Sequence, residues 1–132
     1  VLMFLLAAPL CLWSVWRGVR TAHLGTGWLA GVSALLLLSP LFSAQFVGWL
    51  APGAAVAWSE GDRRPALMAA VTIALTEIFW NRYDAVLGGA TAALATVVVR
   101  NLALGALLVL ALRTLARASV VEADLQPDLA AV

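Results

Sequence analysis

The stretch LGTGWLAGVSALLLLSPLF, residues Leu24–Phe42, decides the fold because none of its side chains is charged. A second run, Ala66–Phe79, is nearly as apolar, and the whole chain of 132 residues is 64% hydrophobic with a mean hydropathy of +0.99. A domain of this size buries only about 60–70% of the surface that its unfolded chain exposes. A soluble core could not hide so much apolar area, so the sequence predicts an all-α, polytopic membrane protein, or a piece of one.

The remaining composition excludes several classes of function. All eight basic residues are Arg and the net charge is only +1, so nothing indicates nucleic acid as a partner. The absence of Lys and the abundance of Ala, Gly, Val and Leu indicate GC-biased coding and a bacterial source. The single Cys11 cannot form an internal disulfide and is expected to be an inert packing residue. No residue cluster has metal-ligand spacing and no glycine-rich phosphate loop is present, so we predict no metal site and no bound cofactor.

Five apolar segments predict a bundle of about five transmembrane helices over residues 1–118. The first segment has 16 residues, just under the 17–25 that cross a bilayer, so we expect it to be truncated from a longer protein, with a GTG start codon as the alternative. The third has 14 residues, about 21 Å of helix, and is expected to be tilted, re-entrant or fused to the turn before it. The segments are Val1–Trp16, Leu24–Phe42, Gln45–Trp58, Pro65–Trp80 and Gly89–Leu112.

The Arg residues predict the orientation of this bundle. Five crossings place six Arg side chains on one side and only Arg82 on the other, and the positive-inside rule makes the Arg-rich side cytoplasmic. The N-terminus then faces out and the C-terminus faces in, across a bacterial inner membrane. The polar, acidic tail Ser119–Val132 is expected to form a separate, loose cytoplasmic end. The six residues are Arg17, Arg20, Arg63, Arg64, Arg113 and Arg117.

Arg100 is the polar residue that is most costly in its predicted place. Only 12 residues separate it from Arg113, so it lies in the membrane or at its outer boundary, where a central Arg costs roughly 2.5–3.5 kcal/mol on insertion. Its partner is either a phosphate or a structural group such as a backbone carbonyl or a buried carboxylate. Glu77, the only carboxylate inside a predicted span, is a proton acceptor, a partner of Arg100 or an interfacial residue that reaches water, and structural pairing is favoured. Asn101 is expected to hydrogen-bond between helices. One carboxylate is too few for a paired acid–base mechanism.

The other polar and aromatic candidates lie near the predicted membrane surfaces. His23 is expected to be a hydrated residue of the cytoplasmic interface. Gln45, in the outer turn, either contacts substrate hydroxyls or caps the third helix. Four Trp residues are expected to anchor at headgroup depth, with Trp49 as the one most suited to stack on a sugar. These four are Trp28, Trp49, Trp58 and Trp80.

The outer turn and the start of the third segment, LSPLFSAQFVGWLAP at residues 38–52, resemble a signature of bacterial GT-C superfamily membrane glycosyltransferases. The family pattern there is Ser-Lys-x-x-Ser-Pro-Gln-Tyr-x-x-Trp-x-x-Pro. Pro40, Ala44 and Phe46 stand where the family has Lys, Pro and Tyr, and Tyr83-Asp84 and Arg100–Leu104 resemble the last two family spans. The residues that match the signature are Ser39, Ser43, Gln45, Trp49 and Pro52.

The resemblance implies the C-terminal membrane region of an enzyme that transfers a sugar, typically mannose, from a polyprenyl-phosphate donor on the outer face. The catalytic acidic residue of that superfamily lies in the first outer loop, upstream of this chain, so the resemblance implies no catalytic residue here. The implied partners are membrane lipid, the lipid-linked sugar donor and the remainder of a longer polypeptide. The candidate contacts to the donor phosphate or substrate are Ser43, Gln45, Trp49 and Arg100.

Two other functions fit the same residues. The first is a small non-catalytic accessory subunit that packs beside a larger membrane complex. The second is a transporter fragment in which Glu77 and Arg100 form an ion-coupled pair.

Overall fold

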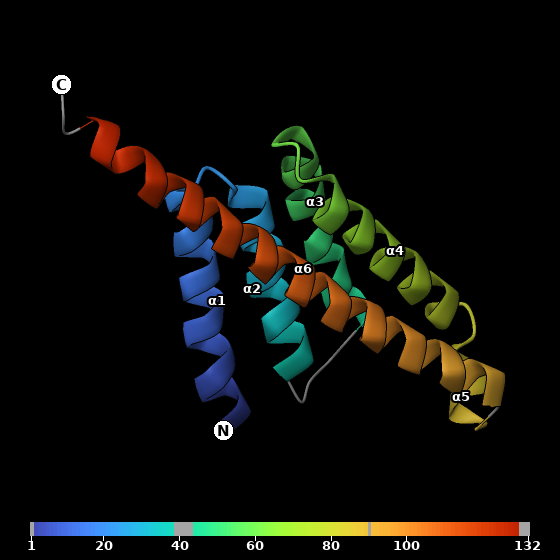
Figure 1. Cartoon of the computed structure of the whole chain (residues 1–132). Coiled ribbons are helices and arrows are strands. Elements are labelled where there is room, and N and C mark those ends of the chain that lie inside the picture. The colour runs from blue at the N-terminus through green and yellow to red at the C-terminus, as the bar shows by residue number, and fades with distance from the viewer. Residues whose placement is uncertain (1, 39–43, 90, 130–132) are drawn as a thin grey trace.

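The computed structural model describes residues 2–38, 44–89 and 91–129, and every regular element within them is a helix (Figure 1). The predicted all-α class is therefore confirmed. The elements in chain order are α1 (Leu2–Arg20), α2 (Leu24–Leu38), the 3₁₀-helix η1 (Ala44–Trp49), α3 (Leu50–Ser59), α4 (Arg63–Trp80), α5 (Tyr83–Leu87) and α6 (Thr91–Leu129).

Each predicted apolar segment corresponds to a helix. The first continues one turn beyond Trp16, to Arg20, and the third begins as η1 before it becomes α3. The short third segment is therefore fused to the turn before it, one of the three predicted arrangements. The single-turn helix α5 was not predicted, because five residues are too few to show a helical periodicity.

The last helix is longer than the sequence predicted. The apolar pattern placed its end near Leu112 and a loose tail after residue 118, but α6 continues through Leu129. The sequence did not predict that residues 119–129 are helical. Residues 118–126 contain Ala, Glu, Leu and Gln, which favour helix, and neither Gly nor Pro; Pro127 comes only two residues before the last residue of the helix, Leu129.

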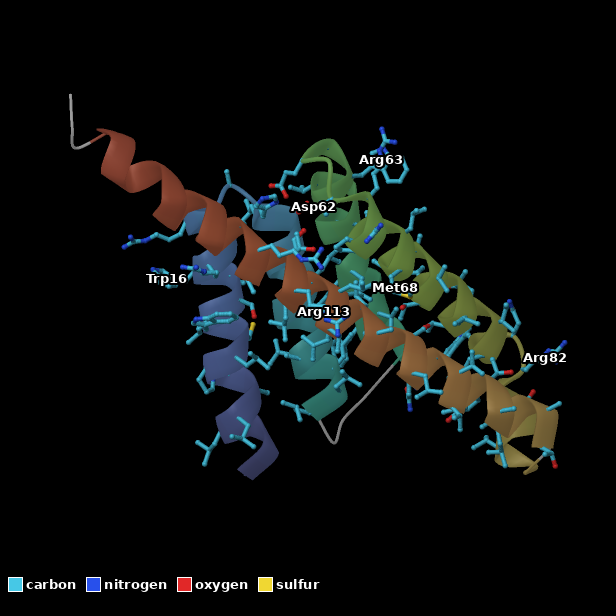
Figure 2. The ribbon with its side chains drawn as sticks, viewed as in Figure 1. Trp16, Asp62, Arg63, Met68, Arg82 and Arg113 are labelled. Carbon is cyan, nitrogen blue, oxygen red and sulfur yellow. The ribbon has the colours of Figure 1, made fainter. Side chains whose placement is uncertain are left out.

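Successive helices form antiparallel hairpins, and α6 crosses them. Helix α1 packs on α2, α2 on α3 and α3 on α4, whereas α6 runs obliquely across both α2 and α4 (Figure 1). One end of the bundle therefore holds the α1–α2 and α3–α4 turns, and we call it the Arg end, because Arg17 and Arg20 close α1 and Arg63 and Arg64 open α4. The opposite end, the α5 end, holds η1, α5 and the start of α6. Figure 2 shows Asp62 and Arg63 at one end of α4 and Arg82 at the other.

The core lies where α6 crosses the hairpins. Leu29 of α2, Leu50 of α3 and Leu104 and Leu107 of α6 are buried together, with Val47 of η1 in the same cluster. The buried residues of α6 recur every three or four positions, which places them on one face of the helix. This buried stripe consists of Arg100, Leu104, Leu107, Ala111 and Leu115.

Helices α1 and α2 approach unusually closely because glycine lines their contact. A Cβ atom added at Gly27 would lie 2.6 Å from the carbonyl oxygen of Ser14 and 2.9 Å from the Cα of Gly18. Small residues that allow such backbone approach are typical of helix pairs in membranes.

One helix among the described residues is long and apolar enough to cross a membrane. It covers Leu94–Ala118, 25 residues with a mean hydropathy of 2.1, and only 22% of its most apolar window is buried. Leu24–Leu38 and Phe46–Ser59 are apolar but shorter.

Candidate functional site

Arg100 is buried where α4 and α6 pack together. Its side chain is only 4% exposed, and its guanidinium carbon lies 4.8 Å from the centre of the Phe79 ring of α4. The guanidinium also donates to Oδ1 of Asn101, from Nη2 at 3.0 Å and from Nε at 3.3 Å. A cation over an aromatic face is attracted by the negative charge density of the ring. Phe79 and Asn101 therefore fix the plane of a buried positive charge.

Two sequence predictions about the neighbours of Arg100 need correction. Glu77 lies exposed on α4, and no ion pair joins it to Arg100 in the described structure, because the α-helical rotation of α4 turns Phe79 rather than Glu77 toward α6. Asn101 does not bond between helices here, since its carbonyl oxygen accepts from the adjacent residue of its own helix. The ion-coupled pair of the transporter alternative therefore has no geometric support.

Of the candidate contacts to the donor that the sequence predicted near the outer turn, the structure describes only part. Ser43 lies outside the described residues, and Gln45 is described only as backbone within η1. The Trp49 ring is 53% exposed and packs edge-to-face against Phe46 at 5.0 Å. Its backbone carbonyl accepts a 2.8 Å hydrogen bond from the indole N–H of Trp28, which ties η1 to α2.

Helix η1 and the Arg100 site both lie at the α5 end of the bundle. Val47 of η1 shares a buried cluster with Leu104, and Leu104 lies one helical turn after Arg100 on the same stripe. Helix η1 and Arg100 are therefore at the same end of the bundle.

An aromatic group follows α4 at this same end. Tyr83 of α5 packs edge-to-face on Phe79 at 5.9 Å and against Trp80 at 5.5 Å. Trp80 and Tyr83 are both exposed, beside the exposed polar residues Arg82 and Asp84. Exposed Trp and Tyr rings beside polar groups are typical of a membrane–water interface.

A second polar cluster, which we call the turn clasp, joins the two turns of the Arg end. It consists of His23, Thr26, Glu60 and Asp62. Glu60 accepts the backbone N–H groups of Leu24 at 2.9 Å and Gly25 at 3.0 Å, so a carboxylate from the α3–α4 turn caps the N-terminus of α2.

The second half of the turn clasp is centred on Asp62. Its Oδ2 lies 2.7 Å from Nδ1 of His23 and also accepts the hydroxyl of Thr26. His23 is therefore partly exposed and bonded to a carboxylate, a partner that the sequence analysis did not predict. The sequence carried a usable signal: the predicted topology places the only His and two carboxylates in turns on the same side.

An apolar groove opens between α1, α2 and α3, with a volume of about 430 Å³. Trp28 forms part of its wall. Ala30, two residues later and roughly 200° around the helix, packs on α6 instead, so the groove opens on the face away from α6. The lining residues are Val15, Leu24, Gly25, Trp28, Pro52, Gly53 and Val56.

Arg100 is the buried charged side chain among the described residues. No group of three or more potential metal ligands occurs within them, and Glu77 and Asp84 are exposed at separate positions of α4 and α5. A buried guanidinium, by contrast, suits a phosphate or carboxylate.

No protein-family model, curated protein or solved structure matches the chain. The similarity to GT-C glycosyltransferases therefore stays a prediction from the sequence motifs.

Proposed function

We propose that the chain is a multi-pass helical membrane bundle and forms the C-terminal membrane region of a glycosyltransferase that uses a polyprenyl-phosphate sugar on the outer face. In this proposal Arg100 binds the phosphate of the donor. The observation that carries it is the burial of the Arg100 guanidinium between α4 and α6, at the end of the bundle opposite the Arg end. Gln45 and Trp49 of the GT-C-like motif belong to η1, at the same end.

The distribution of apolar and charged side chains supports the multi-pass part of the proposal. Helices α1 and α4 have 19 and 18 residues, about 27–29 Å at 1.5 Å per residue, close to the roughly 30 Å of a hydrocarbon core. Large apolar side chains are exposed on every long helix, which suits lipid better than water. Examples are Leu12, Trp28, Val56, Val71 and Leu102.

The proposed role of Arg100 is to stabilise the departing phosphate. As the bond from the sugar carbon to the phosphate oxygen breaks, negative charge develops on polyprenyl phosphate. A guanidinium donates charge-assisted hydrogen bonds to phosphate in a fixed geometry. A preformed site that stabilises developing charge lowers the barrier. The base that deprotonates the acceptor hydroxyl belongs, in this proposal, to a part of the enzyme outside these residues.

The test is the contribution of the phosphate to binding. The full chain is reconstituted in nanodiscs and titrated with a short polyprenyl phosphate and with the polyprenol of equal length. We expect the phosphate to bind more tightly, and Arg100→Gln to remove about 1.5–3 kcal/mol of that advantage, roughly 10- to 150-fold in Kd. Arg100→Lys, which keeps the charge but loses the planar fork, is expected to be intermediate.

The matched control is Arg82→Gln, which removes an exposed Arg at the same end and should leave both affinities unchanged. Circular dichroism and elution volume establish that each variant is folded. Equal binding of polyprenyl phosphate and polyprenol by the unaltered chain would contradict the proposal. That outcome would favour the accessory-subunit alternative.

A further inference from the structure

Asn101 is the polar residue next to Arg100 on α6, and the guanidinium of Arg100 decides the orientation of its amide group. Oδ1 of Asn101 accepts from Nη2 of Arg100 at 3.0 Å and from Nε at 3.3 Å. A guanidinium carries only donors, so the amide atom that faces it must be the carbonyl oxygen. Nδ2 of Asn101, with its two N–H donors, therefore occupies the other position of the amide.

The Nδ2 group of Asn101 is accessible to a ligand. Asn101 is exposed, whereas the side chain of Arg100 is buried. Within the parts of the chain that the structure describes, the side-chain hydrogen bonds of Asn101 are the two that Oδ1 accepts, so Nδ2 donates to no protein group there. The amide thus satisfies its oxygen inside the protein and presents its donors to an acceptor from outside.

The surface of α6 around Asn101 is apolar. Asn101 lies within the apolar helix Leu94–Ala118, and Val98, one turn before it, is 58% exposed. At Gly105, one turn after it, an added Cβ would meet nothing within 4 Å. In the proposed membrane placement this face contacts hydrocarbon, where amide donors without a partner are costly. The donors of Asn101 therefore suit an acceptor that is carried on an apolar chain.

The two adjacent residues together limit the chemistry of that acceptor. Arg100 supplies a positive charge and Asn101 supplies neutral donors beside it, so the pair suits an anion with at least two oxygens. The phosphate of a polyprenyl-phosphate sugar is a diester with two non-bridging oxygens, one for each residue. A guanidinium has five N–H donors and can therefore hold both Oδ1 of Asn101 and a phosphate oxygen.

We propose that Asn101 is a second ligand of the donor phosphate: Arg100 orients the amide and binds one non-bridging oxygen, and Nδ2 of Asn101 donates to the other. The inference rests on the proposed function, because it concerns the same phosphate site. It gives Asn101 a binding role in place of the bond between helices that the sequence predicted. Loss of the amide should weaken the binding of the phosphate and leave the binding of the prenyl chain unchanged.

Nuclear magnetic resonance can observe this amide directly, because Asn81 is the only other asparagine of the chain. The full chain is labelled with ¹⁵N-asparagine in maltoside micelles, and Asn81→Gln assigns the two pairs of side-chain signals. We expect a short polyprenyl phosphate to shift the Nδ2 signals of Asn101 and the polyprenol of equal length to leave them in place. The exposed amide of Asn81 is the internal comparison and should shift less.

Substitutions measure what the amide contributes to affinity. Asn101→Leu, of similar volume but without donors, is expected to weaken the binding of polyprenyl phosphate about 10-fold. Asn101→Asp keeps an oxygen toward Arg100 but puts negative charge where the donors were, so it should weaken binding further. Both variants should bind polyprenol as the unaltered chain does. The matched control is Asn81→Leu, which should change neither affinity, and circular dichroism establishes that each variant is folded.

The outcomes separate this inference from the proposed function. If the unaltered chain prefers polyprenyl phosphate but the Nδ2 signals of Asn101 do not follow it, or Asn101→Leu binds it equally well, the inference is overturned and the proposed function stands. An equal shift with phosphatidylglycerol would identify a phospholipid headgroup as the ligand and would also overturn it. A chain without any preference for polyprenyl phosphate over polyprenol would overturn both.

Discussion

Gly27 shows how one missing side chain sets the distance between two helices. A Cβ atom at this position would meet the backbone of α1 at Ser14 and Gly18, and backbone cannot yield as a flexible side chain does. The close approach buries Thr26 and brings His23 to the turn clasp. The absence of a side chain at Gly27 therefore permits the close contact between α1 and α2.

Gly27→Ala is expected to destabilise the folded chain by about 1–3 kcal/mol, because the added methyl group overpacks a helix contact. Thermal or denaturant unfolding in detergent measures the change. The control is Gly105→Ala in α6, where an added Cβ meets nothing within 4 Å and should stabilise the helix by about 0.5–1 kcal/mol. Equal effects of the two substitutions would contradict the proposed role of close approach.

For single residues, the sequence predicted which side chain is buried better than it predicted which side chains contact it. The unbroken apolar pattern around Arg100 indicated that its charge would be costly, and the side chain is indeed buried. Its contact with Phe79 could not be predicted, since it depends on how far α4 is rotated against α6. Glu77 lies two residues before Phe79, about 200° around α4, so it points away from Arg100.

At the scale of elements, the turn clasp is what joins the α1–α2 hairpin to the α3–α4 hairpin at the Arg end. Glu60 and Asp62 stand on either side of Gly61, whose φ of +89° is in the left-handed region that glycine adopts without strain. This turn lets both carboxylates reach the start of α2. The helix N-terminus, with unpaired N–H groups, is the place where a carboxylate is most stabilising.

Glu60→Ala is expected to lower the free energy of unfolding by about 0.5–2 kcal/mol, because two backbone N–H groups of α2 lose their cap. The loss should appear as faster amide hydrogen exchange at Leu24 and Gly25. Glu77→Ala removes the exposed carboxylate of α4 and provides the comparison, with no change expected in either measurement. Unchanged exchange in Glu60→Ala would show that the cap does not hold this end of α2.

Element boundaries followed the apolar pattern, and the departures have physical causes. Helix α6 continued past its apolar segment because backbone hydrogen bonding requires no apolar face, only residues that tolerate helix. The clasp was missed because hydropathy reports burial and says nothing about which turns meet in space. Knowledge of the hairpin topology was needed before Glu60 and Asp62 could be matched to His23.

At the scale of the whole molecule, the antiparallel hairpins give the bundle two chemically different ends. The α1–α2 and α3–α4 turns and four Arg residues lie at the Arg end, whereas α5 and Arg82 lie at the other. An asymmetric distribution of Arg is what fixes the orientation of membrane helices during insertion. The two ends should therefore face opposite compartments.

Cysteine labelling tests this orientation in a Cys11→Ser background, which removes the only native thiol. A membrane-impermeant maleimide added to intact cells is expected to label Asp84→Cys, whereas Ser59→Cys should react only after permeabilisation. Both residues are exposed, so access is set by the membrane. Labelling of both positions from the same side would contradict the hairpin arrangement in the membrane, and the reverse pattern would invert the orientation.

Helix α6 spans 39 residues without interruption, so Arg100 near one end of the bundle and Arg117 near the other are fixed on one rod about 26 Å apart. The helix packs on both α2 and α4, which it crosses, so a rigid movement of one arm would also move the other. A ligand that drew the Arg100 side of the rod toward α4 would swing the opposite arm away from α2. Binding of a ligand near Arg100 would thereby change the position of the Arg117 arm of α6.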